Sequence, residues 1–372
     1  MQQADLKLKV MEYFSGLPQL DDAGDSLHLI KDNYRKAHEP QRNKKFVKNH
    51  AFFTKKINRI DKYIANGPEI NPSKIDPEVE VVISGTQSAD IFRMVALNWS
   101  VPVSEGYGRR IRFNVWDKNT EKLIGIFALG DAVFNLKVRD DFIGWQAEDR
   151  TKKLVNLMDA YILGSVPGYS NLLGGKLIAS LIKTKEITDI FRNKYANSTG
   201  LISKNQKHPY LSYVTVTSAL GKSSIYNRLK LHGDKIFSPI GMTSGWGHFH
   251  VSDEIFILLL EYLCSVDDDY ANTYKFGSGA NWKIRVIKKA LSKLGISTNV
   301  MKHGYYREVF MCEMAKNARE LVMGIEGAPD YSGLKSIKEQ SQLAIERWVI
   351  PRSERDQSYL NFRNTDFLAN YA

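Results

Sequence analysis

The stretch from Ile111 to Leu129, IRFNVWDKNTEKLIGIFAL, decides the fold class. Residues 111–116 and 123–129 are rich in β-branched, aromatic and aliphatic side chains, whereas residues 117–122 between them are polar. Two such runs around a short polar segment predict a β-hairpin. The middle of the chain is therefore expected to contain a sheet.

Strand and helix patterns continue on both sides of this hairpin. Before it, we expect a strand at 79–83 and a helix at 88–97. After it, we expect a strand at 157–163, a Gly- and Pro-rich turn at 164–175, a helical run at 176–195, a strand at 211–217, a helix near 223–231 and a Gly-punctuated strand pair around 236–251. The order of hairpin, strand, helix, strand, helix and strand predicts one α/β domain with a mixed sheet.

Composition divides the chain into four sections. Residues 1–67 are expected to be helical and basic, because apolar residues recur at three- and four-residue spacing among charges. Residues 68–78 are a linker, since Pro68, Pro72 and Pro77 rule out a continuous helix. Residues 79–253 form the mixed α/β core domain. Residues 254–372 form a mainly helical section, with strand content around 302–311.

The chain carries a large positive charge. Among its 372 residues, 52 are Lys or Arg and 41 are Asp or Glu, so the formal net charge is +11. A field of that sign favours polyanions such as nucleic acid or phosphorylated ligands. Between Arg42 and Lys62 the sequence has eight basic side chains and one acid. This stretch is either a solvated helix face or a surface for phosphate contacts.

We expect a cytoplasmic protein without a membrane partner. The segment from Met1 to Tyr13 lacks the apolar stretch of a signal peptide. The longest apolar run, 255–260, is far shorter than the roughly 20 residues that cross a bilayer. Cys264 and Cys312 lie in apolar contexts without CxxC spacing, and we expect two buried, reduced thiols.

A dense set of guanidinium groups stands at the start of the hairpin. Arg109, Arg110 and Arg112 follow the segment Gly106-Tyr107-Gly108. Alternation along a strand places Arg110 and Arg112 on one face, whereas Arg109 points away. Two guanidinium groups on one face form a planar-fork site for phosphate or carboxylate. We therefore expect the shared face to bind an anion.

Further candidates for nucleic-acid or anion binding lie downstream, at Arg139, Trp145, Arg150, Lys176 and Arg228. Aromatic side chains interleaved with Arg and Lys suit stacking on unpaired bases.

Two patterns raise the question of a metal. The carboxylates of Asp140 and Asp141 are either a pair for metal-assisted phosphodiester cleavage or caps of a turn. His248 and His250 alternate on an expected strand, where they suit a structural role, a nucleic-acid contact or a metal site with a third ligand such as His303 or Asp253. We assign no metal, and the cofactor stays open.

If the protein is an enzyme, the candidates for its reaction centre are Ser218, Ser224, Tyr226 and His248. Gly221-Lys222-Ser223 resembles part of a Walker A loop, but Val216 occupies the position of the first glycine of that motif. Without that glycine the backbone cannot wrap the phosphates, so an ATPase site is not expected. Ser223 or Ser224 is instead expected to cap the following helix.

The motifs between about Ile83 and His303 resemble, as a series, the Druantia DruA family of bacterial anti-phage proteins. They are the segments 99–102, 106–112, 139–150, 167–176, 215–228, 241–250 and 302–304. The resemblance implies a role in defence against phage beside partner proteins, including a large helicase-like component. It implies no established reaction.

A second resemblance concerns the core alone. Its element order is similar to the acyl-CoA-binding fold of the GCN5-related acetyltransferases. That resemblance implies a helix N-terminus that cradles a pyrophosphate, with Gly174, Gly175 and Lys176 in that position. The chain departs from active members, because it lacks their compact Gln/Arg-x-x-Gly-x-Gly/Ala signature at this turn.

Three functions are therefore open. The first is a nucleic-acid-binding defence subunit without turnover of its own. The second is an enzyme, either with an acyltransferase-like core or as a metal-dependent nuclease that acts on phage nucleic acid. The third is a non-catalytic scaffold, in which the Arg residues would be interface anchors.

Overall fold

The structure is a computed structural model that describes residues 2–17, 27–103, 108–199, 206–207, 209–267, 280–325 and 327–369. The chain forms two compact units. The smaller unit comprises Met1–Ala37, Ser104–Tyr107 and Thr243–Arg307, and the larger unit comprises His38–Val103, Gly108–Met242 and Glu308–Ala372. The division of the chain into the four sections expected from composition stays a prediction.

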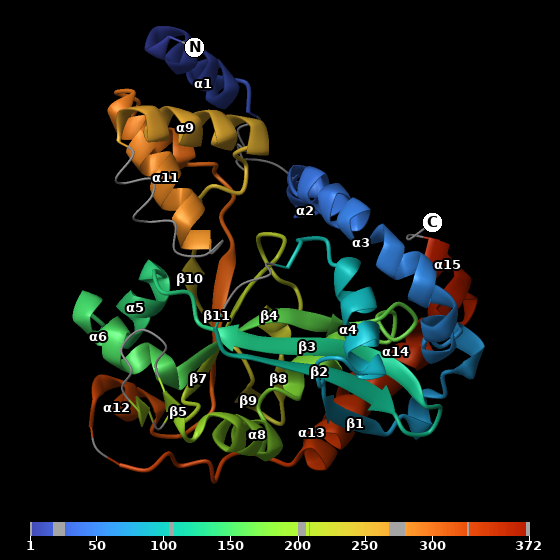
Figure 1. Ribbon diagram of the computed structural model, residues 1–372. Helices are drawn as coiled ribbons and strands as arrows, with labels where there is room; N and C mark the ends of the chain where they lie inside the picture. Colours follow the sequence, from blue (N-terminus) through green and yellow to red (C-terminus); the bar gives the residue numbers. More distant parts are fainter. Residues whose placement is uncertain are drawn as a thin grey trace. The chain divides into compact units, whose positions relative to one another are not determined.

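A seven-stranded sheet forms the centre of the larger unit, with the order β1-β2-β3-β4-β7-β11-β10 (Figure 1). Its strands are β1 (Pro77–Val81), β2 (Arg110–Asp117), β3 (Lys122–Asp131), β4 (Leu157–Ser165), β7 (Tyr213–Thr217), β10 (Ser238–Met242) and β11 (Glu308–Glu313). Neighbouring strands are antiparallel except β4 and β7, which are parallel. The expected class, α/β with a mixed sheet, is confirmed.

The predicted hairpin is present as β2 and β3, paired from Arg110↔Gly130 to Asp117↔Lys122. Residues 123–130 of β3 are buried on both faces of the strand. The Phe113 and Phe127 rings stack across the hairpin with centroids 4.3 Å apart. Burial of these apolar side chains therefore fixes the register of the hairpin, as the sequence pattern indicated.

Helices surround this sheet, and Figure 1 shows α4 in front of β2 and β3, which it contacts. The α-helices of the larger unit are α3 (Glu39–Ile60), α4 (Gln87–Leu97), α5 (Lys137–Ile143), α6 (Ala147–Lys153), α7 (Gly174–Ser180), α8 (Lys185–Tyr195), α12 (Ala318–Met323), α13 (Ile337–Ala344), α14 (Ile350–Arg355) and α15 (Asn364–Ala369). Shorter 3-10 turns are η1 (Asp61–Tyr63), η2 (Gly67–Glu69), η3 (Pro72–Lys74), η4 (Leu154–Asn156), η5 (Tyr226–Arg228) and η8 (Ser358–Asn361). A π-helical segment, η7 (Ile345–Val349), joins α13 to α14.

The single helix expected at 176–195 is wrong, because the chain forms α7 and α8 with a break between them. At this break Thr184 makes a β-bridge with Lys335, and the Lys185 amide donates to the Lys335 carbonyl at 3.0 Å. The C-terminal segment that makes these bonds is distant in sequence. Tertiary pairing therefore interrupts a run whose local periodicity is helical.

The helix expected near 223–231 is also wrong. Only the short turn η5 forms, and it is followed by β8 (Lys230–Leu231) and β9 (Asp234–Lys235), which pair with each other. The turn between them has positive φ at His232 and Gly233. A glycine that follows a residue with positive φ is typical of a tight β-hairpin. This hairpin occupies residues that the expected helix would have included.

The expectation of two paired strands within 236–251 is wrong. Only β10 forms there, and it pairs with β11, at the end of the region 302–311 where strand content was expected. His248 and His250 lie in a turn rather than on a strand. Strand alternation therefore does not place these two side chains on one face. A further short pair, β5 (Ser198–Thr199) and β6 (Gln206–Lys207), forms elsewhere in the larger unit.

The smaller unit is helical and has its own apolar core. Its elements are α1 (Gln3–Ser15), α2 (Leu27–Ala37), α9 (Asp253–Val266), α11 (Ala280–Lys293) and η6 (Thr298–Met301). Buried side chains of α1, α9 and α11 pack together, among them Val10, Leu259 and Ile287. Cys312 is buried, as expected. Cys264 is exposed on α9, so the expectation that its thiol is buried is wrong.

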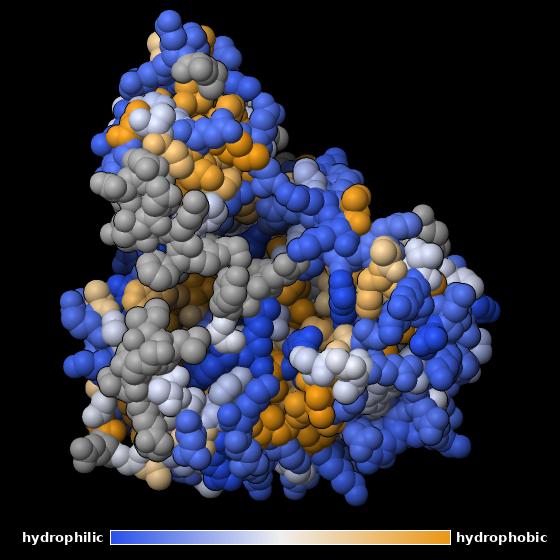
Figure 2. Space-filling model, in the orientation of Figure 1, coloured by the Kyte–Doolittle hydropathy of each residue, from blue (hydrophilic) through white to orange (hydrophobic). Residues whose placement is uncertain are grey.

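Hydrophilic residues cover most of the surface of the larger unit that Figure 2 shows. None of the helices in the described part of the chain is long and apolar enough to span a membrane.

Candidate functional site

Arg110 and Arg112 each lie over an aromatic ring of the larger unit. The Arg110 guanidinium lies 4.6 Å from the centroid of the Tyr161 ring, and Arg112 donates to Ser84 Oγ at 2.9 Å. Arg112 also lies over the buried Phe92 ring, 5.7 Å from its centroid. Both arginines therefore rest on aromatic rings, which orient a guanidinium and leave its charge in place.

Lys194 of α8 brings a third positive charge to the same place. Its Nζ donates to the Arg110 carbonyl at 3.0 Å. Burial lowers the pKa of Lys194, and repulsion by Arg112 lowers it further. Burial raises the pKa of Tyr161, against the opposing effect of Arg110 and Arg112. We call Arg110, Arg112, Tyr161 and Lys194 the Tyr161 cluster.

Two of the three cations in the Tyr161 cluster are not neutralised by a carboxylate. Within the described residues, neither Arg112 nor Lys194 makes an ion pair. All three cations are at least partly exposed, so a ligand can reach them. Like charges that stand close together favour an anion from outside the protein. Anion binding on the shared face of Arg110 and Arg112 stays a prediction.

Arg109 has a different environment. Its Nε donates to Asp131 Oδ1 at 2.6 Å, and its Nη1 donates to the Val155 carbonyl at 2.7 Å. Its guanidinium also lies between 5 and 6 Å from the ring centroids of Phe191 and Tyr195. These contacts occupy the side chain within the fold, so Arg109 is better suited to a structural role than to a ligand.

Arg139, Trp145 and Arg150 form a separate group that is structural in its contacts. Arg139 is fully buried, and its Nη2 donates to Asp140 Oδ1 at 2.6 Å. Trp145 is buried and donates to the Val322 carbonyl at 2.9 Å. Arg150 donates to Asn135 Oδ1 at 2.6 Å and lies 3.6 Å from Asp140. A ligand would have to displace these bonds to reach the group.

The same group bears on the metal-site alternative. Asp140 is committed to Arg139, whereas Asp141 pairs with Lys137 at 2.7 Å on the surface. Among the described residues, no three His, Cys, Asp or Glu side chains stand where they could jointly hold a metal ion. No contact in the described part of the chain therefore favours Asp140 and Asp141 as metal ligands.

A second cationic cluster forms around Lys176 of α7. Burial lowers the pKa of Lys176, and repulsion by Arg228 and Arg347 lowers it further. Its Nζ lies 5.5 Å from the centroid of the Trp348 ring. The structure thus brings together Lys176 and Arg228, both of them candidates from the sequence, and adds Arg347. No local pattern singled out Arg347, because an isolated exposed arginine in a helical segment has no distinctive spacing.

The four proposed catalytic side chains have unlike environments. Ser218 is buried and Ser224 is exposed. The Tyr226 ring packs between Phe237 and Phe310, each with its centroid 5.4 Å away, and burial raises the pKa of its hydroxyl. His248 belongs to the smaller unit, where burial lowers its pKa to about 4.

Ser223, rather than Ser224, caps the turn before Tyr226. Its Oγ accepts hydrogen bonds from the amides of Ile225 and Tyr226 at 3.2 and 3.1 Å. Its own amide donates to Glu308 at 2.7 Å, and Asn227 donates to the same carboxylate. The loop after β7 is therefore held by a carboxylate from β11 and does not have the open shape of a phosphate-binding loop.

Asp159 is a titratable residue of this region that the sequence analysis missed. It pairs with Thr215 at the last parallel pair between β4 and β7, where the two strands separate. Burial raises its pKa to about 6, although the Val133 amide donates to it at 2.8 Å and Arg139 lies nearby. An aspartate in a strand gives no sign in the sequence that its carboxyl is desolvated.

The basic stretch 42–62 lies mostly on α3. Phe53 and Ile60 are buried in the main core, while Lys56 pairs with Asp90 of α4 at 2.8 Å. Lys45 donates to the Val103 carbonyl. Part of this basic face is thus used within the larger unit, and its contact with phosphate stays a prediction.

Comparison with known proteins gives two matches. A family model described as Druantia protein DruA matches residues 28–324. The curated Druantia protein DruA of Escherichia coli (strain UMEA 4076-1) is 45% identical over 369 residues, which cover 98% of this chain and 91% of that relative. No solved structure matches the chain.

Proposed function

Because this chain belongs to the Druantia protein DruA family, we propose that it is a component of a bacterial anti-phage defence system and that it binds nucleic acid through the Tyr161 cluster. Family membership confirms the resemblance drawn from the motif series. The resemblance also suggests action beside partner proteins, including a helicase-like subunit.

The observation that carries the proposal is a group of three neighbouring cations. The Arg110 guanidinium lies over the Tyr161 ring, Lys194 donates to the Arg110 carbonyl, and the charge of Arg112 acts on both Tyr161 and Lys194. Two residues along a strand span about 7 Å, so the two guanidinium groups can contact one phosphate or two neighbouring ones. Phosphate oxygens match the fork of a guanidinium in a bidentate manner. A surface of this kind holds the backbone of a nucleic acid without reading its sequence.

The test measures binding of a fluorescein-labelled single-stranded DNA by anisotropy at increasing salt. Log K falls as log salt rises, and loss of one phosphate contact in Arg112→Ala should make this negative slope shallower by about 0.7. Arg319→Ala, an exposed residue of α12, is the control, because it removes the same charge from elsewhere on the larger unit. Its slope should stay at the wild-type value.

Phage protection by cells that carry the complete defence system provides the second measurement. Arg110→Ala combined with Arg112→Ala should abolish protection at an unchanged melting temperature. Full protection by this double variant, or equal slopes for Arg112→Ala and Arg319→Ala, would reject the Tyr161 cluster as the binding site.

One structural feature favours a second candidate function, acyl transfer. The strands β4 and β7 pair only from Leu157↔Tyr213 to Asp159↔Thr215, although β4 continues to Ser165. A Cβ atom at Gly175 would lie 3.8 Å from Ser165 Oγ, so α7 begins beside the far end of β4. Lys176, Arg228 and Arg347 stand at that end with charges that suit a diphosphate.

An acyl-CoA would supply the acyl group in this second function, and the three cations would hold its diphosphate. Calorimetric titration with acetyl-CoA tests the fit directly. Binding that is lost in Arg228→Ala but kept in Arg112→Ala would support acyl transfer. No heat of binding with wild-type protein would remove this candidate and leave the nucleic-acid proposal untouched.

A further inference from the structure

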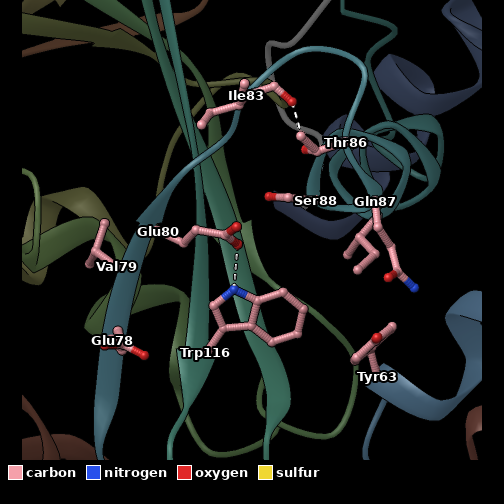
Figure 3. Close-up of a pocket in the computed structure, with 10 residues that line it drawn as sticks. Tyr63, Glu78, Val79, Glu80, Ile83, Thr86, Gln87, Ser88 and Trp116 are labelled. Atoms are coloured by element: carbon pink, nitrogen blue, oxygen red, sulfur yellow. Dashed lines mark hydrogen bonds between the residues drawn. The ribbon is translucent and has the colours of Figure 1, made fainter.

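A polar groove of about 680 Å³ lies along β1, at the edge of the sheet (Figure 3). One side is formed by Glu78, Val79 and Glu80 of β1, and the other by residues of the loop and first turn of α4. Trp116 of β2 and Tyr63 complete the wall, with ring centroids 5.5 Å apart in an edge-to-face arrangement.

The charge of this groove opposes that of the whole chain. Among the described residues, its lining includes the carboxylates of Glu78 and Glu80 and no Lys or Arg, whereas the chain carries a net charge of +11. Lys118 forms an ion pair with Glu78 at 3.7 Å, and both side chains are about half exposed, so an incoming cation can compete for this carboxylate. The Tyr63 ring already has Lys62 Nζ 5.0 Å from its centroid. The groove therefore presents negative charge beside the Trp116 ring, and this combination favours an ammonium or guanidinium group.

Glu80 is held in position for such a contact. Its Oε2 accepts from Trp116 Nε1 at 2.7 Å, the bond drawn in Figure 3. The same oxygen lies 3.4 Å from Asn114 Nδ2, and Asn114 Nδ2 also donates to Ser88 Oγ at 2.9 Å. Asn114 is fully buried and anchors Glu80 from behind the groove. An incoming N–H donor would thus meet a carboxylate that is fixed in place.

The backbone of β1 indicates that the ligand with this cation is an extended peptide. The Val82 amide donates to the Arg112 carbonyl, and the Lys118 amide donates to the Asp76 carbonyl. Since bonds alternate along an antiparallel strand, even-numbered residues of β1 bond to β2, and Val79 points its backbone N–H and C=O outward. Helix α13 also contacts β1, but residues 78–80 border the groove. An outward edge of this kind can pair with an extended peptide.

We propose that this groove docks an extended segment of a partner protein that carries lysine or arginine. The segment adds to the outer edge of β1 near Val79, and one basic side chain enters the groove beside Glu80 and Glu78. Main-chain hydrogen bonds supply affinity, and the charged pocket supplies specificity. The site is separate in its residues from the Tyr161 cluster and goes beyond nucleic-acid binding.

The probe is a fluorescein-labelled synthetic peptide of alternating lysine and valine, titrated with the full-length chain. The net positive charge of the protein opposes binding of such a peptide in general, so observed binding reports a local acidic site. Glu78→Gln combined with Glu80→Gln should weaken binding about tenfold or more, because charge-assisted bonds are lost. Glutamine at position 80 can still accept from Trp116, so the variant should keep its fold and its DNA affinity.

Three controls decide the outcome. Glu148→Gln in α6 removes an exposed carboxylate elsewhere in the larger unit and should leave the affinity unchanged. The same peptide with N-methylated valine amides should bind weakly, because strand addition needs those donors. The proposal would be overturned if the double variant lost no affinity, or if Glu148→Gln lost as much. It would also be overturned if the methylated peptide bound as well as the unmodified one, or if spermine displaced the peptide at equal charge concentration.

Discussion

Arg110 and Tyr161 meet across the sheet, with the guanidinium 4.6 Å from the ring centroid, although β3 lies between their strands. Gly130, the β3 partner of Arg110, makes this contact possible. A Cβ atom at position 130 would approach the Tyr161 ring to 3.0 Å. The absence of a side chain on the middle strand therefore lets two outer strands share one cation–π pair.

Replacement of Tyr161 separates the role of its ring from that of its hydroxyl. Tyr161→Ala should weaken binding of single-stranded DNA about two- to fivefold, which corresponds to a cation–π contact of about 0.5–1 kcal/mol. Tyr161→Phe keeps the ring and should bind nearly as well as the wild type. Anisotropy titrations at one fixed salt concentration measure both. Equal losses in the two variants would contradict an orienting role for the ring.

Removal of Arg139 should cost stability rather than binding. Asp140 would remain mostly buried without its partner, and such losses typically destabilise by about 3–5 kcal/mol. Arg150→Ala is a milder matched variant, since its contact with Asp140 is longer, and about 1 kcal/mol is expected. Urea unfolding gives both free energies. An Arg139→Ala protein with wild-type stability would show that Asp140 finds another partner or water.

The Asp159 carboxyl should make stability fall as the pH rises. Burial raises its pKa from 3.8 to about 6, while Arg139 and the Val133 amide oppose the shift and Asp131 adds to it. The folded state therefore binds a proton more tightly than the unfolded state, and the stabilisation is lost between about pH 4 and 6.

Urea unfolding across this range should show the trend in the wild type and its loss in Asp159→Asn. Asparagine keeps an acceptor for the Val133 amide and carries no charge. Above pH 6 the variant should be more stable than the wild type. Parallel stability curves for the two proteins from pH 4 to 8 would mean that ionisation of Asp159 costs the folded state little free energy.

His248 should have the opposite effect in the smaller unit. Burial, with smaller contributions from Lys283 and His250, lowers its pKa from 6.5 to about 4. The unfolded state then binds more protons, so stability should fall as the pH drops from about 6.5 to 4. NMR titration of the histidine rings should show one pKa near 4 that is missing in His248→Gln. A His248 resonance that titrates near 6.5 would contradict its burial.

Elements with local causes are predictable from the sequence alone. The apolar runs around 117–122 specified the β2–β3 hairpin, and periodicity specified α4 to within a residue of 88–97. Alternation also placed Arg110 and Arg112 where both act on Tyr161. In each case neighbouring residues set the backbone conformation, so a short window of sequence contained the necessary information.

Which distant residues become neighbours depends on tertiary packing. It paired β10 with β11, broke the 176–195 helix against Lys335, and brought Arg347 to Lys176. It also enclosed Arg139 and left Glu80 beside a groove, although both are charged residues in the sequence. Burial and charge repulsion depend on which surfaces pack together. Packing joins segments that are distant in sequence, and local periodicity does not predict such contacts.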